Sequence, residues 1–192
     1  YLSNFAPFIP QLAVPMLTGV YRIPLVAAEV KGILSNTVPV DAYRGAGRPE
    51  ASYLIERVVD LAARELGIGP EALRRLNFVR PDEMPYATPV HTEIDSGEFE
   101  KIMDAALDNA DWKGFDARRT ASAARGKLRG RGMAMYIERC GGGNGHTISF
   151  KVDEQGEATV FTGMHDNGQG HVTTLVQLVS DRLQIDASRV KV

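Results

Sequence analysis

The feature that most constrains how this chain can fold is a glycine-spaced turn that runs directly into an amphipathic helix. The turn lies in "VDAYRGAGRPEASYLIERVVD", residues 40–60, where Gly45 and Gly47 come just before Pro49. Proline suits the first turn of a helix, and glycine suits the residue after its last turn. A helix is therefore predicted from Pro49 to a C-cap at Gly67, with its apolar side chains at helical spacing: Leu54, Ile55, Val58, Val59, Leu61 and Ala62.

A second stretch, "FTGMHDNGQGHVTTLVQLVSDRL" at residues 161–183, has the same layout. A short apolar run leads into a glycine-rich turn, and the pattern then changes to helical spacing. We predict a helix from about His171 to Leu183, with apolar side chains at Leu175, Val176, Leu178, Val179 and Leu183.

Further elements of the first half follow from turn and capping signals. Residues 21–37 are rich in β-branched and apolar side chains, broken by proline and glycine, and predict short strands or extended segments. A short helix is predicted to start at Pro70. Another is predicted after Ser96 as its N-cap, with Glu98 and Glu100 favourably placed in the first turn.

The second half has the pattern of a sheet. Residues 129–140 predict a strand, "GGGNG" at 141–145 a turn, and residues 146–163 a hairpin that bends at "DEQGE". The closing "SRVKV" is typical of a strand just beginning. The fold class is therefore α+β: two α/β pieces with mixed or antiparallel sheets and packed helices.

A basic, small-residue stretch separates these pieces. Residues 113–131, "KGFDARRTASAARGKLRGR", have the composition of a linker, so we expect a first piece at 1–112 and a second at 132–192. The alternative, a nucleic-acid site, is disfavoured because aromatic residues are not interleaved there for base stacking.

Composition excludes several classes of protein. Apolar residues make up 44% of the 192-residue chain, which is ordinary for a globular protein, and a net charge of -2 favours neither nucleic acid nor an anionic membrane. The single Cys140 excludes an internal disulfide and fits a reducing compartment, so we expect a cytoplasmic protein. No apolar run approaches the roughly 20 residues of a membrane span. Since the first residue is Tyr1 and the last strand is barely begun, we expect a fragment of a longer chain.

The second glycine-rich turn, "HDNGQGHVTT", has the chemistry of a polar-ring or phosphate site. Gly168 and Gly170 allow backbone N–H groups to approach a ligand, and the helix that follows presents unpaired donors and a positive dipole end. Gln169 offers a donor and an acceptor to an amide-like ring edge, and further bonds are available in the first helical turn from His171, Thr173 and Thr174. The alternative is a plain connection, in which Asp166 and Asn167 only shape the turn.

Other kinds of site are not indicated. "GGGNG" lacks the spacing of a dinucleotide fingerprint, and no G-K-[ST] is present for a phosphate-binding loop. The histidines His91, His146, His165 and His171 lack metal-site spacing, and Cys140 has no cysteine neighbour, so we expect no metal ligand among the side chains. No serine lies in a nucleophile elbow.

Taken together, "AYRGAGRPEA" and "TGMHDNGQGHVTT", with "EIDSGEFEKIMDAAL" between them, resemble the molybdenum-binding large subunit of the xanthine dehydrogenase, aldehyde oxidase and aerobic carbon monoxide dehydrogenase family. The likeness runs from about residue 21 to residue 192. It implies a molybdopterin cofactor, often the cytosine dinucleotide in bacteria, held by Gly168, Gln169, Gly170, His171, Thr173 and Thr174. It also implies that the loop at residues 43–49, with Arg44, Gly45 and Ala46, forms a wall of the substrate pocket beside the metal.

The reaction implied by the resemblance is hydroxylation of an electron-poor carbon, with water as the oxygen source and a glutamate as base. Electrons would leave through iron–sulfur clusters and FAD on partner subunits or domains of an oligomeric enzyme. The family's base glutamate belongs to a motif expected beyond Val192, and neither Glu50 nor Glu138 matches it. We therefore expect the 192 residues alone to be inactive and to hold the cofactor weakly, because several of its contacts would be absent.

Two departures from the family pattern bear on substrate. Carbon monoxide-oxidising members carry a copper-binding cysteine where this chain has Gly45, and purine-oxidising members carry a phenylalanine where it has Ala46. Since glycine offers no soft ligand to copper, an aldehyde or N-heterocycle is the expected substrate. Two alternatives stay open: a non-catalytic binding or assembly module that keeps the fold, and a nucleotide-binding protein that uses "GGGNG".

Overall fold

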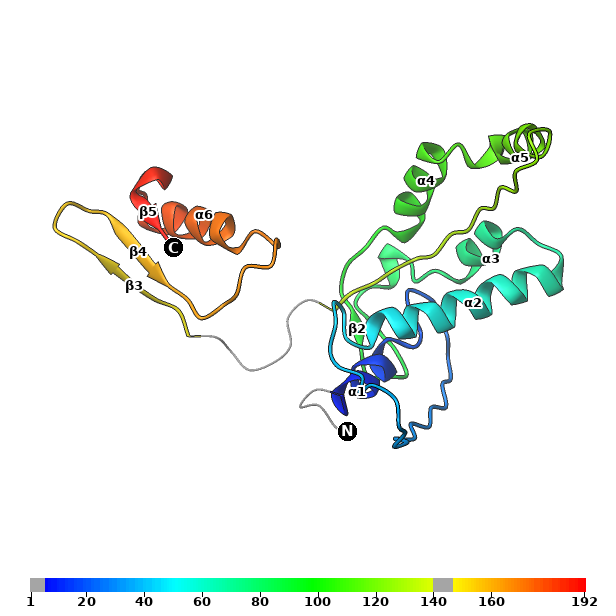
Figure 1. The fold of residues 1–192 in the computed structure, drawn as a ribbon, viewed down its shortest axis with the longest axis horizontal. Coiled ribbons are helices and arrows are strands. Elements are labelled where there is room, and N and C mark those ends of the chain that lie inside the picture. Colours follow the sequence, from blue (N-terminus) through cyan, green and yellow to red (C-terminus); the bar gives the residue numbers. More distant parts are fainter. Residues whose placement is uncertain (1–5, 140–146) are drawn as a thin grey trace. The chain divides into compact units, whose positions relative to one another are not determined.

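The computed structural model describes residues 6–139 and 147–192. The chain divides into two compact units, Tyr1–Arg139 and Cys140–Val192, which we call unit 1 and unit 2 (Figure 1). The turn expected at residues 141–145 lies outside the described residues, as does Cys140.

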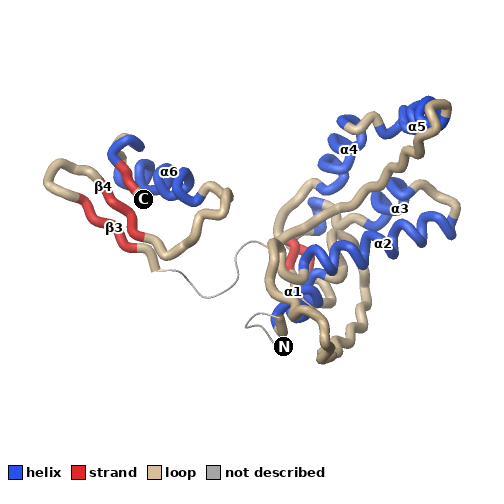
Figure 2. Tube along the Cα trace, in the orientation of Figure 1, coloured by secondary structure: helices blue, strands red, loops and turns tan. Residues whose placement is uncertain are grey.

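Unit 1 is mainly helical, with one small antiparallel sheet. Figure 1 shows α2 and α3 side by side, and Figure 2 shows a long loop between α1 and α2. The elements in chain order are α1 (Phe8–Ala13), η1 (Val14–Met16), α2 (Arg48–Leu66), α3 (Pro70–Asn77), η2 (Pro81–Glu83), β1 (Tyr86–Ala87), β2 (Glu93–Ile94), α4 (Phe99–Asn109), η3 (Trp112–Gly114) and α5 (Phe115–Ala123).

Helix α2 confirms the prediction for the first glycine turn. It begins at Arg48, with Gly47 as N-cap, and ends at Leu66. Gly67 closes it at φ +67°, and its N–H donates to the carbonyls of the last turn. Glycine is favoured there because other residues pay a steric penalty in the left-handed region. Helix α3 begins at Pro70, as predicted.

Unit 2 is a three-stranded mixed sheet with one long helix. Strands β3 (Ser149–Val152) and β4 (Ala158–Phe161) form the predicted antiparallel hairpin, with Phe150 opposite Val160. At the bend, the Asp153 carboxylate accepts hydrogen bonds from the N–H groups of Gln155 and Glu157. Helix α6 (His171–Leu183) and η4 (Ala187–Arg189) then lead to β5 (Val190–Lys191). Because β5 pairs parallel to β4, residues 158–191 form a β-α-β unit and "SRVKV" does begin a strand.

The predicted cap of the helix after Ser96 is wrong. Helix α4 begins at Phe99 with Glu98 as N-cap, whereas the Ser96 hydroxyl donates to the Asp95 carboxylate. An adjacent carboxylate therefore competes for the hydroxyl that would have capped the helix.

Residues 21–37 were predicted to form short strands or extended segments. Strand pairing there is limited to an isolated bridge between Tyr21 and Phe78, and residues 22–37 are loop.

The region expected to be a linker contains structure. Within residues 113–131, α5 spans Phe115–Ala123, and its buried Phe115 lies under the guanidinium of Arg131, 4.7 Å from the ring centroid. Alanine and arginine favour helix strongly, and one buried ring anchors this one to its surroundings. The division between compact units falls instead at residues 139 and 140.

The strand predicted at residues 129–140 is wrong for its described part, because residues 129–139 form no strand, although residues 133–138 keep the side-chain alternation of one. The odd-numbered Met133, Met135 and Ile137 turn towards the core, whereas the even-numbered Tyr136 and Glu138 turn away from it. An extended backbone places successive side chains on opposite faces, which explains why this segment has the sequence pattern of a strand.

Each unit has its own apolar core. In unit 1 the rings of Tyr21 and Phe78 stack with centroids 5.7 Å apart. The buried residues of this core are Val20, Tyr21, Phe78, Val79, Ile94, Phe99, Met103 and Met135. The core of unit 2 lies between the sheet and α6 and consists of Ala158, Val160, Leu175 and Val190.

A fully buried arginine ties unit 1 together. The Arg74 side chain is 0% exposed, and its guanidinium donates to Glu56 Oε2 (2.7 Å), contacts Asp60 Oδ1 (2.9 Å) and donates to the carbonyl of Met133 (3.2 Å). Glu56 also accepts the Tyr21 hydroxyl at 2.5 Å. Burial and this bond raise the pKa of Tyr21, so its hydroxyl stays a donor. Two helices and two loop segments are joined by this one network.

We predict that Arg74→Ala destabilises unit 1 by about 3–5 kcal/mol, because it leaves the buried Glu56 carboxylate without its partner. Denaturant unfolding of the chain, followed by fluorescence of its single tryptophan, Trp112, measures the loss. The matched control is Arg75→Ala, which removes exposed pairs to Glu100 and Asp104 and should change stability little. Equal losses in the two variants would contradict a special role for the buried arginine.

Candidate functional site

The first glycine turn has an unusual backbone. Gly45, Ala46 and Gly47 all have positive φ, at +89°, +35° and +93°. The N–H of Ala46 donates to the carbonyl of Tyr43 (2.8 Å), and that of Arg48 to the carbonyl of Gly45 (3.1 Å). A left-handed alanine is strained, and such strain is maintained only where neighbouring structure holds it.

Close neighbours on both sides hold this turn. A side chain at Gly47 would overlap the carbonyl oxygen of Ile9 and approach the N of Ala13 to 2.8 Å, so the backbone of α1 lies directly against it. A side chain at Gly45 would come within 2.7 Å of the Pro49 ring and 3.0 Å of the Tyr136 hydroxyl. Glycine is therefore required at both positions by space as well as by φ.

The rest of the first loop is open. Tyr43 is 78% exposed and Arg44 is exposed, whereas Gly47 is buried against α1. The loop thus presents Tyr43 and Arg44 outwards, with Gly45 and Ala46 partly accessible beside them. This arrangement can offer backbone groups, a phenol and a guanidinium to a ligand, although no ligand set for a metal is formed by side chains there.

The second glycine turn lies where β4 ends and α6 begins. Gly168 and Gly170 have φ of +98° and +78°, and a side chain added to either would meet no atom within 4 Å. Gly170 is the N-cap of the 13-residue helix. The carboxyl end of a strand in a β-α-β unit, next to a helix N-terminus, is where α/β proteins bind anionic and polar ligands.

This turn already holds a negative charge. The Asp166 carboxylate accepts the N–H of Gly168 at 3.0 Å. That bond, with further N–H groups of Gly170 and Val172 and the nearby His171, keeps the pKa of Asp166 below its usual range. The Asp166 carboxylate therefore occupies backbone donors of the turn, and a phosphate would have to displace it to use them.

The Gln169 side chain hydrogen-bonds to the backbone of its own turn. Its Oε1 accepts the N–H of Asn167 (2.6 Å), and its Nε2 donates to the carbonyl of His165 (2.9 Å). The same Nε2 lies 3.3 Å from Nδ1 of His171, so both of its donor positions have a partner within the turn, and one acceptor position of Oε1 stays available to a ligand edge. The Thr174 hydroxyl donates back to the carbonyl of Gly170 (3.0 Å), whereas Thr173 is exposed. Gln169 and Thr174 thus brace the turn, a contribution that the sequence alone did not indicate.

The predicted site residues fall into two groups in different units. Arg44, Gly45 and Ala46 share the turn before α2 in unit 1. The other six lie in the turn before α6 and in its first residues, in unit 2: Gly168, Gln169, Gly170, His171, Thr173 and Thr174. Each group is brought together within its own turn.

The sequence analysis missed two residues beside the first turn. Glu138 pairs with Arg48, with Nε and Oε1 3.2 Å apart, and the Tyr136 hydroxyl donates to the other Glu138 oxygen. The alternating pattern of residues 131–139 was a signal that they share one face, but nothing in the sequence indicated which loop they meet.

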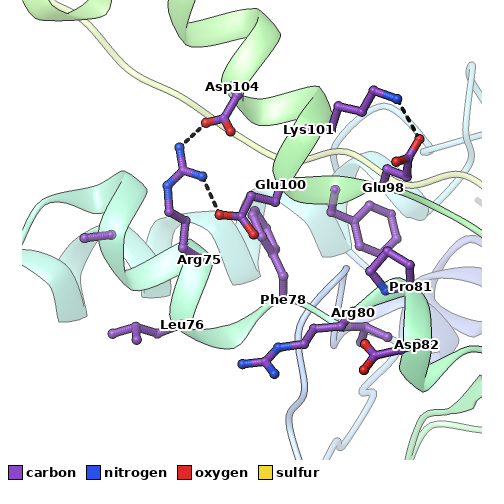
Figure 3. A pocket seen from close by; sticks show the side chains of 13 residues that line it. Arg75, Leu76, Phe78, Arg80, Pro81, Asp82, Glu98, Glu100, Lys101 and Asp104 are labelled. Atoms are coloured by element: carbon purple, nitrogen blue, oxygen red, sulfur yellow. Dashed lines mark hydrogen bonds and ion pairs between the residues drawn. The ribbon is translucent and has the colours of Figure 1, made fainter.

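A separate cleft of about 910 Å³ lies between α3 and α4 (Figure 3). Its walls carry charges already paired with one another: Arg75 with Glu100 and Asp104, and Lys101 with Glu98. None of the predicted site residues lines it. Because its charges are largely compensated, we do not assign it a polar ligand.

A side-chain metal site and a membrane-spanning helix are both absent from the described residues. Among residues 6–139 and 147–192, no three His, Cys, Asp or Glu side chains gather as metal ligands. Within the same ranges, every helix is too short or too polar to cross a bilayer.

Comparison with known proteins identifies two matching segments of the chain. Two family models, both described as molybdopterin cofactor-binding domains, match residues 1–78 and residues 105–192. The nicotine 6-hydroxylase large subunit of Paenarthrobacter nicotinovorans is 31% identical over 91% of this chain and 23% of its own length. The carbon monoxide dehydrogenase large chain of Hydrogenophaga pseudoflava is 32% identical over 91% of this chain and 24% of its own.

Solved structures show the same fold. Quinoline 2-oxidoreductase from Pseudomonas putida 86 superposes with a TM-score of 0.82 at 27% identity, covering 94% of this chain and 25% of that one. Fold and domain matches together define a molybdopterin-binding protein. The chain belongs to the molybdenum-binding large-subunit family of the xanthine dehydrogenases, aldehyde oxidases and carbon monoxide dehydrogenases, and it spans about a quarter of the length of the relatives it matches.

We predict that Gly47→Ala destabilises unit 1 more than Gly67→Ala. Both glycines have positive φ, which costs an alanine about 1–2 kcal/mol. Only at Gly47 does the added methyl also meet backbone, that of α1, whereas at Gly67 it meets nothing within 4 Å. Denaturant unfolding of both variants separates steric overlap from backbone strain. Equal destabilisation would show that α1 does not hold the turn.

Proposed function

We propose that this chain is the cofactor-binding part of a larger molybdenum hydroxylase, which hydroxylates an aldehyde or an N-heterocycle with oxygen from water. The observation that carries the proposal is the pair of glycine turns, each open to a ligand and each within a segment matched by a molybdopterin cofactor-binding model. Relatives named as hydroxylase and dehydrogenase subunits support the reaction class.

The turn before α6 holds the cofactor in this proposal. The N-terminal end of α6 faces its phosphates, and His171 and Thr173 add side-chain bonds from the first turn. The N–H groups of Gly168 and Gly170, which bond to the Asp166 carboxylate in the free chain, would turn to the cofactor when that carboxylate is displaced. Gln169 would offer its remaining acceptor position to the pterin edge, while the Thr174 hydroxyl bonds back to the Gly170 carbonyl. The cofactor, in its cytosine dinucleotide form, supplies the molybdenum that transfers oxygen to substrate.

The turn before α2 forms a wall of the substrate pocket. Gly45 and Ala46 let the substrate approach the backbone closely, and the exposed Arg44 is available to polar groups on it. The base glutamate belongs to another part of the parent protein. Glu138 does not serve as this base, because both its oxygens are engaged, one by Arg48 and one by Tyr136.

Similarity to carbon monoxide dehydrogenase does not extend to copper. A copper-binding cysteine would have to replace Gly45, where φ is +89° and a side chain would come within 2.7 Å of Pro49. The turn has no space for a side chain at position 45, so this loop offers copper no thiolate ligand. The small Ala46 likewise provides no aromatic ring to stack on a purine.

Partners and location complete the proposal. Iron–sulfur and flavin subunits or domains accept the electrons in an oligomeric enzyme. Relatives named as a large subunit and as a subunit of a complex support the presence of partner subunits. We place the parent protein in the cytoplasm because the sequence has a single cysteine, Cys140, which fits a reducing compartment.

One observation favours the competing possibility, a binding module without catalysis: Gln169 and Asp166 already hydrogen-bond to the backbone of their own turn.

We predict that the parent protein, purified from its host, contains near-stoichiometric molybdenum and pterin, little copper, and incorporates heavy oxygen from labelled water into an aldehyde or N-heterocycle. Elemental analysis and mass spectrometry of the product measure this. The 192-residue chain, as a control, should hold little molybdenum because it lacks most of the parent's contacts. Absence of molybdenum and pterin from the parent would favour the binding module, and stoichiometric copper with carbon monoxide oxidation would refute the substrate assignment.

A further inference from the structure

Arg48 joins the first turn to a distant segment of unit 1. Its NH1 donates to the carbonyl of Gly45 (3.2 Å), and its Nε faces Glu138 Oε1 (3.2 Å). The side chain is only 15% exposed, so this ion pair is partly shielded from water. A charge-assisted bond in such a place is stronger than one at the surface and fixes the direction of the guanidinium.

The Glu138 carboxylate is shared between two partners. While Oε1 faces Arg48, Oε2 accepts the hydroxyl of Tyr136. Burial, followed by this hydrogen bond, raises the pKa of Tyr136 to about 12, so the phenol remains a donor at neutral pH. The same hydroxyl lies 3.0 Å from the place where a side chain would stand on Gly45. Both side chains therefore contact Gly45. Arg48 bonds to its carbonyl, and the Tyr136 hydroxyl lies on the side of its Cα where a side chain would stand.

Packing against the core fixes the positions of Tyr136 and Glu138. Met133, Met135 and Ile137 pack on the core, so the alternate residues Tyr136 and Glu138 are directed to the opposite face. The segment is held further by the bond from Arg74 to the carbonyl of Met133. A displacement of this segment would therefore move both groups that contact Gly45.

We propose that Glu138, together with Tyr136, is a positioning residue for the pocket wall: it directs Arg48 onto the Gly45 carbonyl and so maintains the strained turn of Gly45, Ala46 and Gly47. This inference rests on the proposed function for the statement that the turn is a pocket wall. The contact between Glu138 and the turn does not depend on it. Neither Glu138 nor Tyr136 needs to touch substrate to act in this way.

The consequence is that Glu138→Ala frees Arg48 and allows the turn to relax. In the parent enzyme, kcat/KM should fall on the order of 10- to 100-fold, because a pocket group displaced by about 1 Å can cost 100-fold. Molybdenum and pterin content should be unchanged, since the cofactor contacts proposed in unit 2 are untouched. Glu138→Gln should recover part of the loss, because its amide oxygen still accepts from Arg48 without the full charge.

The experiment combines hydrogen–deuterium exchange with kinetics in three variants of the parent protein: Glu138→Ala, Glu138→Gln and the control Glu100→Ala. The control removes a carboxylate from another arginine, Arg75, whose second partner Asp104 remains. We expect faster exchange in the peptide covering residues 43–49 for Glu138→Ala, a smaller change for Glu138→Gln, and none for Glu100→Ala.

The two readouts separate the possible failures. Unchanged exchange at residues 43–49 in Glu138→Ala would overturn the positioning role, whatever the enzyme's activity. Faster exchange with unchanged kcat and KM for a confirmed substrate would also overturn it, because the turn would then move without affecting the pocket. If the parent held no molybdopterin, the proposed function would fail, while exchange would still decide whether Glu138 holds the turn.

Discussion

The buried pair of Arg74 and Glu56 is the interaction on which the rest of unit 1 depends. An ion pair out of water costs several kcal/mol of desolvation per charge and persists only when its remaining donors and acceptors are also bonded. Here they are: Tyr21, Asp60 and the carbonyl of Met133 complete the set. Since each comes from a different part of the chain, the network requires α2, α3, the segment before residue 22 and the segment after residue 131 to assemble together.

This network also fixes the residues that support the first glycine turn. The segment held at Met133 directs Tyr136 and Glu138 towards Gly45, and α1 closes on Gly47 from another side. The second turn is supported differently. It lies in a β-α-β unit, directly before the helix capped by Gly170, and its own Gln169 side chain bonds to the backbone of the loop. Two unrelated supports thus hold the two turns in their conformations.

Periodicity in the sequence was enough to predict helices α2, α3 and α6 and the hairpin of unit 2, because their apolar spacing and end residues are local signals. The family resemblance was confirmed by the family models that match residues 1–78 and 105–192. What local signals could not show is the partner of a side chain: Arg74 stands in an "RR" pair that looks like a solvated surface, yet it is fully buried while Arg75 is not. The helix at residues 115–123 was missed because one buried ring, rather than an apolar stripe, anchors it.

The central claim is that this chain comes from a molybdenum enzyme and that its turn before α6 contacts the cofactor. Anomalous X-ray diffraction from crystals of the parent protein, measured at the molybdenum absorption edge, tests it most directly. The account predicts a molybdenum peak in the parent protein, with pterin and phosphate density that reaches Gly168 and the first turn of α6. Absence of a molybdenum peak, or cofactor density that leaves residues 168–174 untouched, would contradict it.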